Sequence, residues 1–292
     1  MSVDDLIVLL AGLPAGAPAH PDLLAVHALD LSGMGLTTLP DEIGALSGLH
    51  TLNVADNQLT ALPEAIGRLS ELRGLIFWGN QLTALPEAIG QLDKVSTLYG
   101  WDNQLTALPA SFSDMAALED CNLGRNRIAA LPPDIGRLRA LTWLNLWDNQ
   151  LTALPRDIGS CRRLQTLKVA DNDLGTLPEE VGLLDGLEWL DAPSAGLTAL
   201  PESIGGMTRL EGLLVPSNTL TDRPASLAGL ARLRRIDLSH NRLREIPAVA
   251  RRLPGLTELW LTGNPIADAT GIEGVEVLGP EGRLLRSPRA GS

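Results

Sequence analysis

The chain has 292 residues and a formal net charge of -12, with hydrophobic residues at 45% and charged residues at 20%. These proportions are typical of globular proteins and exclude a chain that is disordered throughout. No apolar run approaches the ~20 residues that a membrane-spanning helix needs.

The first segment, residues 1–24, is predicted to form an N-terminal cap, with a short helix near Val3 to Ala11. It lacks the basic and then apolar pattern of an export signal. Two cysteines, Cys121 and Cys161, are too few for a disulfide framework, and both fall at interior positions of the pattern described next. We therefore expect a cytoplasmic protein.

From residue 25 to 265 the sequence repeats itself. Asparagine recurs at intervals of 23 residues or twice that, at positions 57, 80, 103, 126, 149, 172, 218, 241 and 264. Around each asparagine the pattern is LxxLxLxxNxLxxLPxxIGxL. Periods of this length are typical of solenoids, in which each copy buries its apolar edge against the next.

Within one copy, Leu52 and Val54 alternate with polar residues, which predicts a strand of a few residues. Asn57 is expected to satisfy backbone groups of its own and of the adjacent copy, forming a ladder along the solenoid. Pro63 suits the start of a helical or 3₁₀ turn, and Gly67 is expected to let the chain leave it. Eleven strands are predicted, centred on residues 29, 52, 75, 98, 121, 144, 167, 190, 213, 236 and 259.

After residue 265 the period is lost. Residues 266–285 are predicted to form a C-terminal cap, and residues 286–292 are predicted to be a tail.

On these motifs the sequence resembles the leucine-rich-repeat superfamily, specifically the 23-residue class with LPxxI in its convex half, as in intracellular Ras-group proteins and the repeat region of bacterial Roco proteins. The resemblance implies an α/β fold: a curved horseshoe with a parallel sheet on the concave face and helical or 3₁₀ turns on the convex face. It says little about function, because such solenoids bind unrelated ligands. The chain has no GxxxxGK[ST] phosphate loop, so the GTPase part of a Roco protein is missing.

Three departures from the pattern predict local effects. Gly100 replaces an inward residue beside Phe77, whose ring is expected to fill the space. Ala195 interrupts the asparagine ladder, and Pro193 and Pro216 each remove a backbone donor, so irregularity is expected there. It is either a tolerated defect or a bend that shapes the binding face.

The outward strand positions form three columns that hold all six tryptophans and the only tyrosine. Exposed aromatic residues usually mark interaction surfaces. Trp101 and Trp147 flank Gly124 in one column, which predicts rings roughly 10 Å apart on either side of a slot. Alternatively, the tryptophan rings stack on one another and shield the sheet. The candidate partner-binding residues are Trp78, Tyr99, Trp101, Asp102, Asn122, Arg125, Trp143, Asn145, Trp147, Asp148 and Trp189.

Aspartates 56, 102, 148 and 171 precede the ladder asparagines and are either turn carboxylates that bond to local backbone or contacts to a basic partner. The acidic excess is N-terminal: residues 1–124 hold 15 acids and 3 bases. Such a field repels phosphate, so neither nucleic acid nor an anionic membrane is an expected partner.

The sequence predicts no enzyme, because no nucleophile with its base, metal cluster or paired acids can be recognised; no catalytic residue, metal ligand or cofactor is assigned. We predict a protein-recognition module, monomeric or weakly self-associating, whose partner has a basic surface. The alternatives are glycan or small-molecule binding in the tryptophan slot, and a scaffold that associates with itself.

Overall fold

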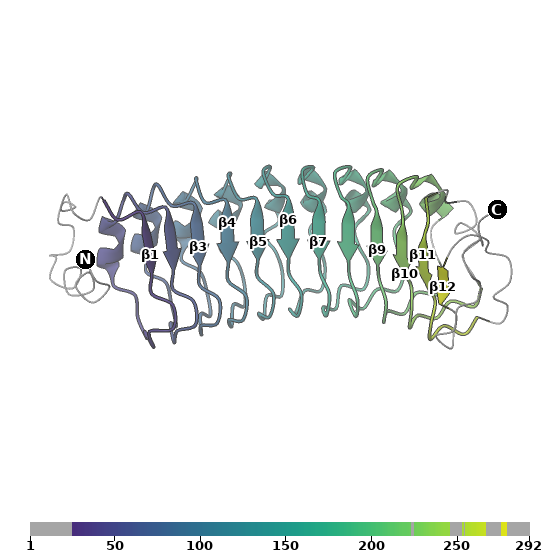
Figure 1. Ribbon diagram of the computed structural model, residues 1–292, viewed down its shortest axis with the longest axis horizontal. Helices are drawn as coiled ribbons and strands as arrows, with labels where there is room; N and C mark the ends of the chain where they lie inside the picture. The colour runs from purple at the N-terminus through teal and green to yellow at the C-terminus, as the bar shows by residue number, and fades with distance from the viewer. Residues whose placement is uncertain (1–24, 223–224, 246–252, 254, 267–275, 279–292) are drawn as a thin grey trace, which may run out of the picture. The chain divides into compact units, whose positions relative to one another are not determined.

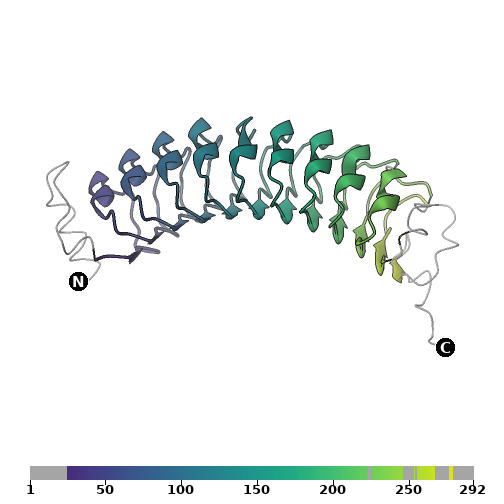
Figure 2. The ribbon, with the colours of Figure 1, turned by 90° about the horizontal axis from the view of Figure 1, so that it is seen from above.

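The computed structural model describes residues 25–222, 225–245, 253, 255–266 and 276–278. It divides into two compact units, residues 1–141 and 142–292. In each unit, short strands form a parallel sheet, and 3₁₀ turns lie on the opposite side (Figures 1 and 2). The predicted helix near the N-terminus and the predicted tail lie outside the described residues.

The strands are three residues long. In the first unit they are β1 (Ala28–Asp30), β2 (Thr51–Asn53), β3 (Gly74–Ile76), β4 (Thr97–Tyr99) and β5 (Asp120–Asn122). In the second unit they are β6 (Trp143–Asn145), β7 (Thr166–Lys168), β8 (Trp189–Asp191), β9 (Gly212–Leu214), β10 (Arg235–Asp237), β11 (Glu258–Trp260) and β12 (Glu276–Leu278). Strands β1 to β11 centre on the predicted residues.

Strand β12 is not in the predicted set. It pairs with β11 in parallel register, Glu258 opposite Glu276, and it follows β11 by less than one full repeat. The sheet therefore continues into the segment that the sequence assigned to the C-terminal cap. The boundaries of the two caps stay predictions.

The 3₁₀ turns follow the prolines of the LPxxI motif. In the first unit they are η1 (Asp41–Ala45), η2 (Glu64–Arg68), η3 (Glu87–Gln91), η4 (Ala110–Asp114) and η5 (Ile135–Arg137); in the second they are η6 (Arg156–Ser160), η7 (Glu179–Leu183), η8 (Glu202–Gly206) and η9 (Ala225–Gly229). Pro63 has an extended backbone and is the N-cap of η2. The Glu64 carboxylate accepts a hydrogen bond from the Ala88 N–H in the next turn, at 3.0 Å.

The reason predicted for glycine at position 67 is wrong. Its backbone φ is not in the left-handed region, so the exit of the chain does not require glycine. A Cβ at this position would instead lie 2.8 Å from the Ala88 carbonyl oxygen of the next repeat. Glycine is needed because successive turns pack too closely for a side chain.

The core of each unit is aliphatic, with inward leucines, isoleucines and valines at or near zero exposure. Both phenylalanines, Phe77 and Phe112, belong to it, as do the buried thiols of Cys121 and Cys161. A Cβ on Gly100 would lie 2.1 Å from the Phe77 ring, so the ring occupies the space that the glycine leaves, as predicted.

The asparagine ladder is confirmed. The Asn57 amide nitrogen donates to the carbonyl of Leu31 in the preceding repeat (2.9 Å) and to that of Val54 in its own (3.0 Å). Its oxygen accepts the Leu36 N–H at 2.9 Å. Asn57 thus satisfies backbone groups of its own repeat and of the preceding one.

At Ala195 the ladder is modified. The Leu174 N–H, which an asparagine at 195 would bind, donates to the Ala195 backbone carbonyl at 2.9 Å. The Asn218 oxygen accepts two N–H groups, those of Ala195 (3.1 Å) and Leu197 (2.8 Å). The missing amide is therefore compensated by backbone and by the next ladder residue.

No such irregularity occurs at the two prolines, contrary to expectation. Each is the second residue after its strand, which we call the exit position. The Pro193 carbonyl accepts the Asp171 N–H at 2.9 Å, and the Pro216 carbonyl accepts the Ser194 N–H at 3.0 Å. The prediction fails because only the carbonyl of an exit position joins the backbone ladder, so a missing N–H removes nothing from it.

No helix among the described residues has the length and hydrophobicity needed to cross a bilayer.

Candidate functional site

The candidate site lies on the side of each sheet that faces away from the 3₁₀ turns, which we call the open face. Along every strand from β2 to β8 the central residue is buried. The flanking residues of these strands are partly exposed, except Asn145, which is buried. All six tryptophans and Tyr99 are partly exposed, whereas both phenylalanines are buried. The predicted orientation of the aromatic columns is therefore correct.

In the first unit the aromatic residues form a cluster of Trp78, Tyr99 and Trp101. The rings of Trp78 and Trp101 stack, with centroids 5.1 Å apart and planes 8° from parallel. The Tyr99 ring lies 5.7 Å from that of Trp101 at an angle of 58°. Stacking between neighbouring tryptophans is one of the two arrangements that the sequence left open. We call these three residues the aromatic cluster.

Tyr99 is fixed in this cluster by a carboxylate. Its hydroxyl donates a 2.7 Å hydrogen bond to Asp120. This hydrogen bond, together with desolvation and the charge of Asp120, raises the pKa of Tyr99 to about 12. The phenol is therefore neutral over the physiological range and holds its ring beside Trp101.

The predicted polar residues mostly serve the turns that follow the strands. Asn122 accepts the Gly124 N–H, and Asn145 accepts the Trp147 N–H, both at 3.1 Å. These bonds engage the side-chain oxygens of two candidate partner-binding residues. A role of either amide toward a partner stays a prediction.

The residues before the ladder asparagines share a left-handed backbone. Asp56, Asp102, Arg125, Asp148 and Asp171 have φ between 51° and 56°. Aspartate tolerates this region better than most residues, so its recurrence is explained by the turn. The side chains remain exposed, and Arg125 lies 3.7 Å from Asp102 in a surface ion pair.

In the second unit Trp189 lies flat on the sheet. A Cβ on Gly212 would come within 2.2 Å of its ring, so the indole covers this glycine. The Arg235 guanidinium lies 6.0 Å from the ring centroid and donates to Glu258 at 3.0 Å. Trp143, Trp147 and Asp148 also belong to this unit and are at least partly exposed.

The predicted slot lies between Trp101 of the first unit and Trp147 of the second. It therefore stays a prediction, and the aromatic cluster is the part of the candidate site that the structure places.

Burial also affects two groups near the open face. Asp191 lies 3.6 Å from Lys168, and desolvation raises the pKa of its carboxyl although the lysine opposes this shift. Burial raises the pKa of the Cys121 thiol, so the thiolate that nucleophilic chemistry needs is disfavoured.

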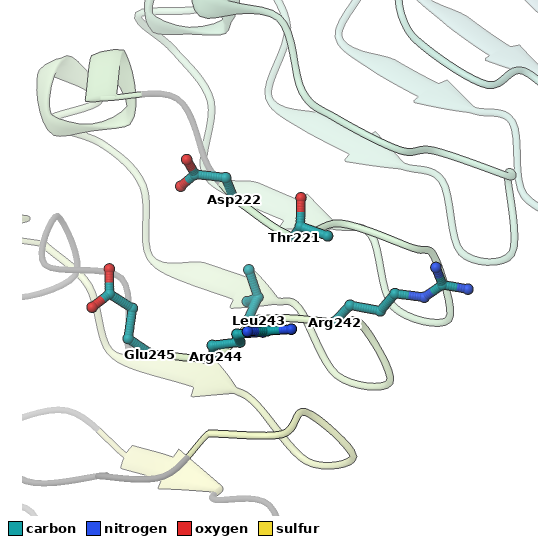
Figure 3. Close-up of a pocket in the computed structure, with 6 residues that line it drawn as sticks. All are labelled: Thr221, Asp222, Arg242, Leu243, Arg244 and Glu245. Atoms are coloured by element: carbon teal, nitrogen blue, oxygen red, sulfur yellow. The ribbon is translucent and has the colours of Figure 1, made fainter.

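A hollow in the described part of the second unit is lined by no aromatic residue. This hollow, drawn in Figure 3, has a volume of about 480 Å³ and is lined by Thr221, Asp222, Arg242, Leu243, Arg244 and Glu245. Charges of both signs line it, and the Arg242 guanidinium extends away from Glu245 (Figure 3). Among the described residues, no three His, Cys, Asp or Glu side chains are grouped closely enough to hold a metal ion.

Comparison with known proteins identifies the repeats. Residues 231–274 match the family model "Leucine Rich repeats (2 copies)", and residues 140–161 match "Leucine Rich Repeat". No curated protein matches the sequence.

Several solved structures are similar. A leucine-rich-repeat protein of Leptospira interrogans is 28% identical, with a TM-score of 0.62, over 91% of this chain and 77% of that one. The plant peptide hormone receptor RGFR1, in complex with RGF2, is 32% identical, with a TM-score of 0.74, over 82% of this chain and 40% of that one. The functional domain of InlJ from Listeria monocytogenes is 26% identical, with a TM-score of 0.73, over 87% and 53%. The chain thus spans about half the length or less of the last two.

Proposed function

Because this chain belongs to the leucine-rich-repeat superfamily, we propose that it is a non-enzymatic recognition module that binds a protein partner through its open face. The observation that carries the proposal is the aromatic cluster. Trp78, Tyr99 and Trp101 remain partly exposed on a sheet, while the phenylalanines are in the core. Tryptophan and tyrosine are the residues most enriched at binding hot spots.

Charge favours a basic partner. Residues 1–124, which include the aromatic cluster, carry 15 acids and 3 bases. Asp56 and Asp102 are exposed in the turns that follow β2 and β4, the strands on either side of β3. An acidic rim around apolar rings accelerates association with a positively charged surface and disfavours acidic ones.

The comparisons favour the same class of function. RGFR1 is a peptide hormone receptor solved in complex with RGF2, and 82% of this chain superimposes on part of it. A solenoid of this kind can therefore recognise a peptide ligand. The partner of this chain need not resemble RGF2, because the residues in the columns on the open face determine specificity.

We further propose that the protein acts in a reducing compartment such as the cytoplasm. Both cysteines are buried thiols, a state that persists in such a compartment. Localisation of the tagged full chain in its source cells tests this: a cytoplasmic signal supports the proposal, and a surface or secreted signal contradicts it.

The experiment for the binding function is affinity capture with the full chain. The wild type is compared with a Trp78→Ala, Trp101→Ala variant, and a Trp260→Ala variant serves as control because it removes a partly exposed tryptophan from β11, outside the cluster. Equal thermal unfolding midpoints establish that all three are folded.

The expected result is a protein that wild type and Trp260→Ala retain and the double variant loses. Loss of two hot-spot rings, at about 2 kcal/mol or more each, weakens binding far beyond the range of capture. A partner that the double variant retains as well as wild type would contradict the proposal.

A further inference from the structure

The exit position, two residues after each strand, has an N–H that the backbone ladder does not use, except where the residue is proline. In five repeats an Asx side chain at the last strand residue accepts it. Asn53 accepts the Ala55 N–H at 3.1 Å, and Asp237 accepts the Ser239 N–H at 2.9 Å. The same bond joins Asp30 to Ser32, Asn122 to Gly124 and Asn145 to Trp147. Because the accepting side chains stand on the open face, the exit N–H groups are directed toward that face.

Two neighbouring repeats of the first unit lack this arrangement. The last residue of β3 is Ile76, whose side chain has no acceptor, and that of β4 is Tyr99, whose hydroxyl bonds to Asp120 and not to the exit N–H. Within the described residues, neither the Trp78 N–H nor the Trp101 N–H donates a hydrogen bond. The repeats on either side, with Ala55 and Gly124 at their exit positions, are capped.

The two open N–H groups form a pair of parallel donors. Adjacent parallel strands lie ~4.8 Å apart, so the donors have about that separation. Each belongs to a tryptophan whose indole stacks on the other, which places both donors beside the aromatic cluster. A backbone N–H without a partner in the protein can donate to an incoming acceptor, and the hydrogen bond so formed favours binding.

The charge around the pair decides between two kinds of acceptor. An anion would approach the exposed carboxylates of Asp56 and Asp102 and the acidic excess of residues 1–124. The same field favours a neutral acceptor attached to cationic groups. A peptide segment with arginine or lysine side chains offers both, because its main-chain carbonyl oxygens are neutral acceptors and its side chains are cationic. These cationic groups can also lie against the indoles.

We propose that the backbone N–H groups of Trp78 and Trp101 bind main-chain carbonyl oxygens of an extended, arginine- or lysine-containing peptide segment. The inference rests on the proposed function and deepens it, because it names the chemistry of the partner and the atoms that hold it. The side chains of Ile76 and Tyr99 determine specificity by leaving both donors open.

One substitution is expected to give the Trp78 N–H an acceptor within the protein without replacing a tryptophan. Ile76→Asn places at this column the residue that caps the exit N–H in three other repeats, where Asn53, Asn122 and Asn145 stand. Ile76→Leu is the matched control, because it changes the side chain at the same position and leaves the donor open. Both variants are made in the full chain, and thermal unfolding confirms that they fold.

Amide hydrogen exchange, followed by NMR, tests the donors directly. In wild type, the Trp78 and Trp101 amides exchange faster than those of Ala55 and Gly124, which are hydrogen-bonded. Ile76→Asn slows exchange at Trp78 and leaves Trp101 unchanged. Slow exchange of both tryptophan amides in wild type would overturn the inference.

Binding is tested with a blocked Arg-Ala-Arg-Ala peptide and its Glu-Ala-Glu-Ala counterpart. The arginine peptide shifts the Trp78 and Trp101 amide signals, and its Kd rises roughly two- to tenfold in Ile76→Asn, the effect of one hydrogen bond, but not in Ile76→Leu. The inference fails if the arginine peptide causes no shift at millimolar concentration, if Ile76→Asn binds as wild type does, or if the glutamate peptide binds more tightly. The capture experiment with the Trp78→Ala, Trp101→Ala variant is independent of these outcomes. Recognition by the open face would therefore still be supported if the peptide inference failed.

Discussion

The pairing of Phe77 with Gly100 makes a quantitative prediction about the core. A methyl group added at Gly100 would lie 2.1 Å from Cε2 and 2.2 Å from Cζ of the Phe77 ring. Favourable carbon contacts are at about 3.5–4.0 Å, so the ring must move by more than an ångström in a close-packed interior. We expect Gly100→Ala to destabilise the protein by about 2–3 kcal/mol, the upper part of the range for overpacking.

The same geometry predicts rescue. Val54 and Val169 occupy this inward position in other repeats, so Phe77→Val with Gly100→Val restores a regular core. Phe77→Val alone leaves a cavity and costs about 2 kcal/mol or more, whereas the double variant is expected within about 1 kcal/mol of wild type. Urea unfolding of the full chain by circular dichroism measures all four proteins. A cost for Gly100→Ala as small as that of an ordinary surface substitution, about 0.5 kcal/mol or less, would refute the reasoning, as would a double variant that is less stable than Phe77→Val alone.

Three further predictions concern single residues. Asn80→Ala leaves three backbone groups of two repeats without partners and is expected to lower stability by about 3 kcal/mol, measured by urea unfolding; a loss under about 1 kcal/mol, the net value of one hydrogen bond, would show that water replaces the ladder. Tyr99 should titrate at about pH 12 by ultraviolet absorbance, and Asp120→Asn should bring it closer to 10; because the folded pKa is the raised one, the stabilisation is complete below pH ~10 and is lost as the pH rises through ~12. Cys121 and Cys161 should resist a thiol reagent in the native protein and both react in denaturant, and rapid reaction of either in the native state would contradict their burial.

The repeat made most of the fold predictable. A period that never shifts determines the position of each strand, and one asparagine per repeat implies a ladder because a short strand leaves backbone groups unpaired. Strand β12 could not be predicted, because the chain reaches it after less than one period and without the LPxxI segment that marks a full repeat.

Two errors came from reading residue types without their hydrogen bonds. The prolines at 193 and 216 suggested a broken ladder, but the N–H at an exit position points to the open face and never joins the ladder. Gly67 suggested a special backbone conformation, but it is required by the carbonyl of the next turn. Neither fact can be read from one repeat alone, because both depend on the distance between neighbouring copies.

The candidate site was predictable in its orientation but not in its detail. Alternation along a strand determines which residues face outward, so the exposed tryptophans were found. The stacking of Trp78 on Trp101 depends on side-chain rotamers, which sequence spacing does not determine. The open N–H groups depend on what stands at 76 and 99, a signal that becomes visible only once the capping role of Asn53 is known.

The measurement that tests recognition by the open face most directly is site-specific photo-crosslinking of the captured partner. A photoreactive residue is placed at Thr97, on the open face of β4 beside the aromatic cluster, and in a second protein at Arg68, exposed on turn η2. The account predicts a crosslink to the partner from position 97 and none from position 68. A crosslink from position 68 alone would place the partner on the turns and contradict the account.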